Sequence, residues 1–83
     1  MDRALSVIAR EIKANWKNVN YAAKPYLDAM LDLNKLTDKY YLDDGDDIVI
    51  RFLGNAQTWR GPRAKEIKAE LNKMLKEHRK QNA

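Results

Sequence analysis

The residues whose types suggest chemistry are few, and the densest group is a run of aspartates around one glycine, 43–47. Carboxylate oxygens are the ligands that calcium prefers, so we compared the run with an EF-hand loop. In a loop starting at Asp43, the third position would be Gly45 and the twelfth Gly54, although both need an oxygen-bearing side chain. The register fails, and we interpret the run as a solvated turn that ends in a helix N-cap, Asp44 or Asp46.

The other nucleophiles and possible metal ligands form no recognisable site. His78 is the only histidine and the chain has no cysteine, whereas zinc sites combine several such side chains. Ser6 is the only serine and lies inside an expected helix, away from a base. The glycines match neither of the common phosphate-binding loops. The sequence therefore predicts a protein that is not an enzyme and that uses no cofactor and no metal ion.

Segments with helical periodicity must position these residues. Apolar residues recur every three or four positions from Leu5 to Val19, which predicts a helix over 3–18 with Asp2 as its cap. Pro25 belongs in a first helical turn, so a second helix is expected over 24–34, after a lead-in turn capped by Asn20. A loop is expected over 37–47.

The third segment, 47–56, allows two interpretations. The β-branched run Ile48-Val49-Ile50 favours a strand, but no second strand is available to pair with it. As a helix, the segment places its apolar residues on one face and leaves Arg51 and Asn55 outward. We expect a helix there, followed by a fourth helix over 62–79 that starts at Pro62.

These segments predict an all-α fold, a small single-domain bundle or orthogonal array of about four helices. With 83 residues the chain makes one domain, 1–83. The expected core consists of Leu5, Ile8, Ile12, Trp16, Tyr26, Leu27, Met30, Leu31, Val49, Phe52, Leu53, Ala56, Ile67, Leu71 and Leu75.

Charge is distributed unevenly along the chain, whose formal net charge is +4. Residues 28–47 hold seven aspartates and two lysines, whereas residues 60–83 hold eight lysines and arginines and three glutamates. The acidic middle and the basic end can attract each other within one copy or between two copies, so the sequence is compatible with a homodimer. There is no apolar run of the length of a signal peptide or membrane span, which predicts a cytoplasmic protein with no membrane partner.

Two contact functions fit such a domain. The first is protein binding, because Trp, Tyr and Arg are the usual anchors of interfaces. The candidates lie in or beside expected loops and are Tyr40, Tyr41, Trp59 and Arg60. Trp59 also fits a structural role in closing one end of the bundle.

The second function is nucleic-acid binding through the basic end of the chain. Residues 52–75 have the outline of a helix-turn-helix unit. The candidate contacts near the start of its second helix are Arg60, Arg63, Lys65 and Lys68. Glu66 and Glu70 interrupt this basic face, and we therefore rank DNA binding second.

Three stretches, Tyr21–Met30, Ile48–Gly61 and Ala64–Leu71, resemble short bacteriophage and prophage proteins of unknown function. The resemblance covers most of the chain. It implies a phage accessory protein in the cytoplasm of a host bacterium, with a host or phage protein, or the phage DNA, as its partner. The group has no assigned activity, so the resemblance implies no functional residue.

Overall fold

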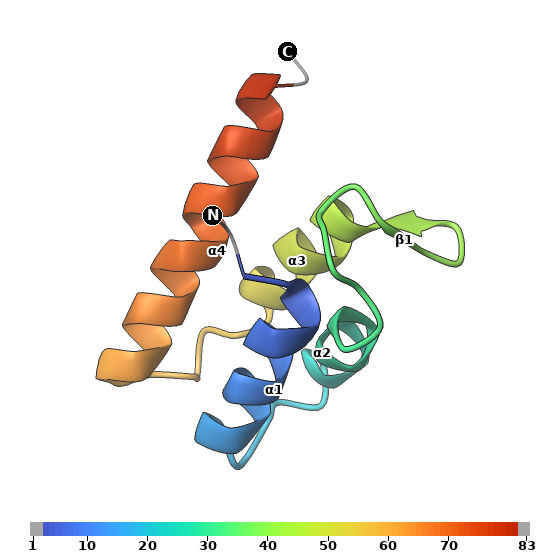
Figure 1. Ribbon diagram of the computed structural model, residues 1–83. Coiled ribbons are helices and arrows are strands. Elements are labelled where there is room, and N and C mark those ends of the chain that lie inside the picture. Colours follow the sequence, from blue (N-terminus) through green and yellow to red (C-terminus); the bar gives the residue numbers. More distant parts are fainter. Residues whose placement is uncertain (1–2, 82–83) are drawn as a thin grey trace.

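The computed structural model describes residues 3–81, which form four helices and one short hairpin. The elements are α1 (Leu5–Asn15), α2 (Lys24–Met30), β1 (Lys39–Tyr40), β2 (Asp43–Asp44), α3 (Gly45–Gly54) and α4 (Pro62–Gln81). The all-α prediction is confirmed. Figure 1 shows α4 along one side of the molecule and the hairpin projecting on the other side, with α1, α2 and α3 between them. No helix in the described range is long and apolar enough to cross a membrane.

The first helix is shorter than expected at both ends. The expected cap, Asp2, lies outside the described residues, and Ala4 at the N-cap forms no side-chain cap bond. Instead the N–H groups of Leu5 and Ser6 donate to the carbonyls of Asn34 and Leu33, at 3.0 and 2.8 Å. These bonds satisfy amides that a helix start leaves unpaired, so α1 is capped by the chain that follows α2.

Helix ends elsewhere are set by the core. Trp16 leaves the helical conformation and is buried, so α1 stops at Asn15 rather than at residue 18. Similarly, α2 ends at Met30 rather than at residue 34, because tighter turns after it carry Leu33 into the core.

Other local predictions are confirmed. Pro25 lies in the first turn of α2 and Pro62 starts α4. The Asn20 side chain accepts the Ala22 N–H at 3.1 Å, in the expected lead-in turn. The segment with the β-branched run is helical, and it begins two residues earlier than predicted, at Gly45.

The expected core is largely buried, although Tyr26, Leu31 and Leu53 are half-buried and pack against it. The core also contains side chains that the expected core did not include: Ala9, Ala23, Ala29, Leu33, Leu36, Ile48, Trp59, Ala64 and Met74. An aromatic cluster holds one end together, since Trp16 stacks on Trp59 at 5.7 Å and Phe52 meets both rings edge-on. This cluster joins the end of α1, α3 and the connection before α4.

Candidate functional site

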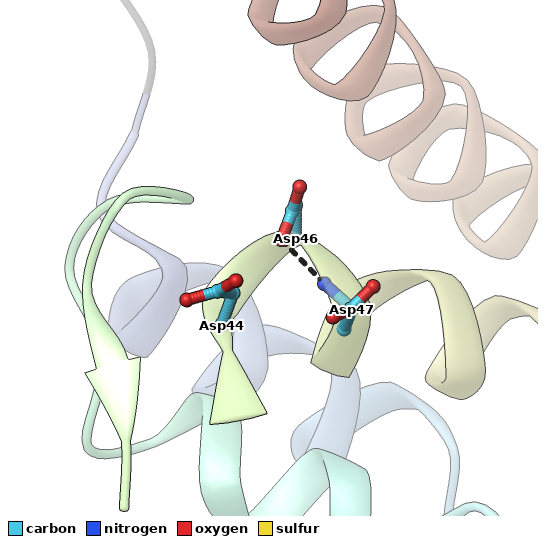
Figure 2. Close-up of side chains that lie close together, drawn as sticks. All are labelled: Asp44, Asp46 and Asp47. Atoms are coloured by element: carbon cyan, nitrogen blue, oxygen red, sulfur yellow. Dashed lines mark hydrogen bonds between the residues drawn. The ribbon is translucent and has the colours of Figure 1, made fainter. Parts of the chain in front are cut away.

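The aspartates at the start of α3 act as parts of a helix N-terminus. Asp44, Asp46 and Asp47 each bring a carboxylate oxygen within 4.8 Å of the others. Figure 2 shows these three side chains around the start of α3. Asp44 takes the N-cap position, as predicted, but its side chain forms no cap bond. The carboxylate of Asp46 instead accepts the N–H of Asp47 at 2.8 Å and lies 3.3 Å from Nε2 of His78. Acidic groups in a first turn interact favourably with the helix dipole, which accounts for the cluster.

Among the predicted nucleic-acid contacts, Arg63 is turned towards α1. Its Nε donates to Oε2 of Glu11 at 2.8 Å, and its Nη1 lies 3.3 Å from Glu66. Arg3 donates to the other oxygen of Glu11 at 2.7 Å and to both oxygens of Glu70, at 2.7 and 2.9 Å. These four ion pairs tie the chain before α1, α1 itself and α4 into one network.

The network changes the proton affinities of its members. Hydrogen bonds from Arg63 and then Arg3 hold the pKa of Glu11 below its ordinary value of 4.5. The bond to Glu11 raises the pKa of Arg63. The guanidinium of Arg63 is thus engaged by two carboxylates of the same chain and is not free to contact a phosphate.

The other three basic candidates lie together. Arg60, Lys65 and Lys68 line a hollow of about 460 Å³ where the connection enters α4. The Nζ of Lys68 donates to the carbonyl of Trp59 at 2.6 Å and lies 5.7 Å from the centre of its ring. Partial burial, followed by the neighbouring charge of Arg60, lowers the pKa of Lys68. Arg60 and Lys65 are exposed.

The connection between α3 and α4 departs from a helix-turn-helix unit. It covers residues 55–61, whereas the turn in such units has roughly three or four residues. Trp59 lies inside this connection and is only 2% exposed. Its Nε1 donates to Oδ1 of Asn15 at 2.9 Å. Trp59 therefore closes one end of the bundle and does not offer its ring to a partner.

The predicted protein contacts at Tyr40 and Tyr41 lie on the hairpin. Lys39 pairs with Asp44 and Tyr40 with Asp43, so Tyr41 and Leu42 form a two-residue turn. Tyr40 is half-buried against the core, whereas Tyr41 is 85% and Leu42 97% exposed. We call Tyr41 and Leu42 the hairpin tip. Figure 1 shows that the hairpin projects from the helices, so the tip is open to a partner.

Tyr41 adopts a backbone conformation that is costly for its residue type. Its φ is +58°, and it is the one described non-glycine residue with a positive φ. A hairpin turn with positive φ at its first central residue normally has glycine there. A side chain in this region costs on the order of 1 kcal/mol, which glycine would avoid. The ring of Tyr41 meets Tyr40 edge-on at 4.8 Å, so the turn holds an exposed tyrosine in a defined place.

The base of the hairpin is fixed by backbone contacts at Gly45. The N–H of Gly45 donates to the carbonyl of Asp38 at 2.7 Å, and the N–H of Asp46 donates to that of Leu36 at 3.1 Å. The Asp38 carboxylate accepts the N–H groups of Lys35 and Asn34, both at 3.0 Å, and these bonds lower its pKa. The hairpin thus stands on a hydrogen-bonded platform made by residues 34–38.

Comparisons with protein families, curated proteins and solved structures find no match for this chain. Its function must therefore be argued from its own surface. There, sequence reasoning missed Leu42, the most exposed of the large apolar residues in the described chain, and also Tyr21, which is 87% exposed. The sequence signal for Leu42 was its place beside two tyrosines within an aspartate-rich stretch that was expected to be a loop.

Proposed function

We propose that this chain is a non-catalytic protein-binding domain that contacts its partner through the hairpin tip. The observation that carries the proposal is the pair of large apolar side chains, Tyr41 and Leu42, on a turn that projects from the fold. Burial of such side chains against a partner stabilises a complex by about 1.5–3 kcal/mol each. Exposed apolar residues scattered singly are common on protein surfaces, but these two are adjacent and stand on an anchored base.

The positive φ of Tyr41 supports the same proposal. Strained backbone conformations concentrate at sites where function requires a particular side chain. A hairpin selected for stability alone would favour Gly or Asn at this position. The tyrosine adds nothing to the core, because its side chain is exposed. Retaining it despite the strain fits a contact residue better than a structural one.

The tip also has a defined chemical character. Asp43 follows Leu42 and is exposed, as is Asp44. The partner's site is expected to combine an apolar pocket with a basic rim, since complementary charge gives specificity and speeds association. The resemblance to phage and prophage proteins favours a host or phage protein in the bacterial cytoplasm as that partner.

The experiment is quantitative affinity capture from a bacterial lysate with the immobilised domain. The tip variant combines Tyr41→Asn and Leu42→Asn, since Asn tolerates positive φ and keeps the turn. The matched control is Tyr21→Asn, because Tyr21 is equally exposed outside the hairpin. We expect the wild type and the control to capture the same protein in similar amounts. The amount captured by the tip variant should be lower by about tenfold or more.

The captured protein is then purified and titrated against all three forms by calorimetry. A direct interaction that the tip variant weakens and the control leaves unchanged supports the proposal. If the tip variant and the control capture the same proteins in the same amounts, the hairpin tip is not the contact site and the proposal is wrong.

Nucleic-acid binding is a second candidate, and one observation favours it. Arg60, Lys65 and Lys68 surround one hollow at the N-terminal end of α4, and helix N-termini attract phosphate groups.

The test of nucleic-acid binding is fluorescence anisotropy of labelled duplex and single-stranded DNA at low and high salt. Binding should weaken steeply with salt and should be lost in Arg60→Ala plus Lys65→Ala. It should persist in Arg10→Ala plus Lys17→Ala, which removes two exposed charges elsewhere. Absence of binding at low salt excludes this candidate.

A further inference from the structure

A second surface of the molecule is an apolar groove between α3 and the C-terminal half of α4. It has a volume of about 580 Å³. Its floor is formed by Ile50, Leu53 and Leu75, of which the first two are half-buried and leave apolar surface uncovered. Its rim carries Lys76, Arg79 and Lys80, all exposed. We call this surface the α3–α4 groove.

The charge of the groove is basic. The described residues that line it include no acidic side chain. The nearest acid in sequence, Glu77, lines a different hollow together with His78. The groove therefore offers apolar surface surrounded by uncompensated positive charge, and it fits an occupant that is apolar at its centre and acidic at its edge.

The same chain carries a segment of that chemistry. The hairpin tip presents two exposed apolar side chains, and Asp43 and Asp44 follow directly and are exposed. Backbone hydrogen bonds at Gly45 hold the hairpin in its projecting position, where both the tip and the groove of one copy are uncovered. The tip of one molecule can thus meet the groove only of another.

We infer that the hairpin tip of one copy docks into the α3–α4 groove of a second copy. Tyr41 and Leu42 contact the apolar floor, while Asp43 and Asp44 pair with the basic rim. If a twofold axis relates the copies, each gives one tip and receives one, and the assembly closes as a dimer. Because the docked segment is short, the association is expected to be weak and dependent on protein concentration.

This inference rests on the proposed function in using the same tip, and it names a second copy as one partner. Self-docking covers Tyr41 and Leu42, so any other partner must compete with it. The fraction of free tips then depends on the concentration of the protein itself. Self-association therefore limits how much of the protein can bind another partner.

The test is the molar mass in solution, measured by sedimentation equilibrium over a wide concentration range. A monomer has a mass of 9.7 kDa, and the average mass of the wild type should rise above this value with concentration. Leu42→Asn should weaken association by about tenfold or more. Tyr21→Asn, an equally exposed site outside the hairpin, should leave it unchanged.

Charge reversal gives a positive result that unfolding cannot imitate. The groove variant, Lys76→Glu plus Arg79→Glu, has an acidic groove and keeps the acidic residues Asp43 and Asp44 beside its tip. The strand variant, Asp43→Lys plus Asp44→Lys, keeps the basic groove and has basic residues beside its tip. Each alone should be monomeric, whereas an equimolar mixture should associate, because both contacts are then between opposite charges. Circular dichroism checks that both variants are folded.

The inference is overturned if the wild type stays at the monomer mass at all concentrations. It is equally overturned if Leu42→Asn or the reversed variants associate like the wild type. Its failure is separable from that of the proposed function. Tip-dependent capture by a monomeric wild type refutes only self-docking, whereas tip-dependent self-association with no tip-dependent capture from lysate refutes only the binding of another protein.

Discussion

Replacement of Gly45 by alanine would place a methyl group against three backbone carbonyls. The added Cβ would lie 2.9 Å from the oxygens of Leu36 and Lys35 and 3.0 Å from that of Asp38, all inside van der Waals contact. All three carbonyls already accept hydrogen bonds: that of Leu36 from the N–H of Asp46, that of Asp38 from the N–H of Gly45, and that of Lys35 from the N–H of Asp38. They cannot move away without weakening the bonds that hold the hairpin on its platform.

The size of the effect follows from this geometry. Inserting a methyl group into a well-packed site costs about 1–3 kcal/mol, and each weakened hydrogen bond contributes up to about 1 kcal/mol within that range. The matched control is Gly54→Ala, since an added Cβ at Gly54, in α3, meets nothing within 4 Å. Alanine in a helix is favoured over glycine by about 0.5–1 kcal/mol, so the two variants should differ by about 1.5–4 kcal/mol.

Urea unfolding followed by far-ultraviolet circular dichroism measures this difference. A domain of this size is expected to have a free energy of unfolding of about 4–12 kcal/mol and an m-value near 1 kcal/mol per molar urea. The midpoint of Gly45→Ala should therefore fall by roughly 1–3 M relative to the wild type, and that of Gly54→Ala should stay or rise. If both variants unfold at the same midpoint with the same m-value, the nearby carbonyls do not require glycine at position 45. The explanation of how the hairpin is held on residues 34–38 is then wrong.

Three further predictions concern the rest of the fold. Trp59→Phe keeps an aromatic ring in the cluster but removes the Nε1 bond to Asn15, so the free energy of unfolding should fall by about 1–2 kcal/mol in urea denaturation. Gly61→Ala should lower it by about 1–3 kcal/mol, since Gly61 has a φ of +116°. Glu11→Gln removes a carboxylate whose pKa is lowered in the folded state by Arg63 and Arg3. Its stabilising effect is complete above its ordinary pKa of 4.5 and disappears as the pH falls through the lower folded value. The variant should thus be less stable than the wild type at neutral pH and should lose less stability on acidification. Urea unfolding from about pH 7 to pH 3 measures this loss. If both proteins lose the same free energy of unfolding over this range, the prediction is wrong.

The helices could be predicted from the sequence because their signals are local. Apolar residues at helical spacing define one buried face of α1, α3 and α4, and Pro25 and Pro62 mark two starts. The predicted helix ends were less accurate, because long-range contacts decide where a helix ends. Trp16 leaves α1 to stack on Trp59, and no periodicity within residues 3–18 contains that information.

The hairpin could not be predicted, because its own residues do not favour it. Its second strand is Asp43–Asp44, and aspartate is depleted in strands. Its turn has Tyr41 where a glycine is usual. It forms because residues 34–38 supply acceptors for its base. The ion-pair network is similarly out of reach of local patterns, since Arg3 and Glu70 are 67 positions apart.

The uneven charge of the sequence survives in the folded molecule. Among the described residues, Arg63 pairs with Glu11 and Glu66 rather than with the aspartates of the hairpin. His78 of α4 lies 3.3 Å from the carboxylate of Asp46, which belongs to the first turn of α3 and not to the hairpin. Lys76, Arg79 and Lys80 are exposed on the last turns of α4, and Asp43 and Asp44 are exposed on the hairpin. One copy therefore keeps a positive and a negative region, which screening by salt weakens over about 8–10 Å. Asp44 contacts Lys39 on the paired strand, at 3.9 Å, whereas the described residues that line the α3–α4 groove bring no acidic side chain to its basic rim. The rim can therefore attract the carboxylates of a second copy, so the self-docking contact should form faster at low ionic strength.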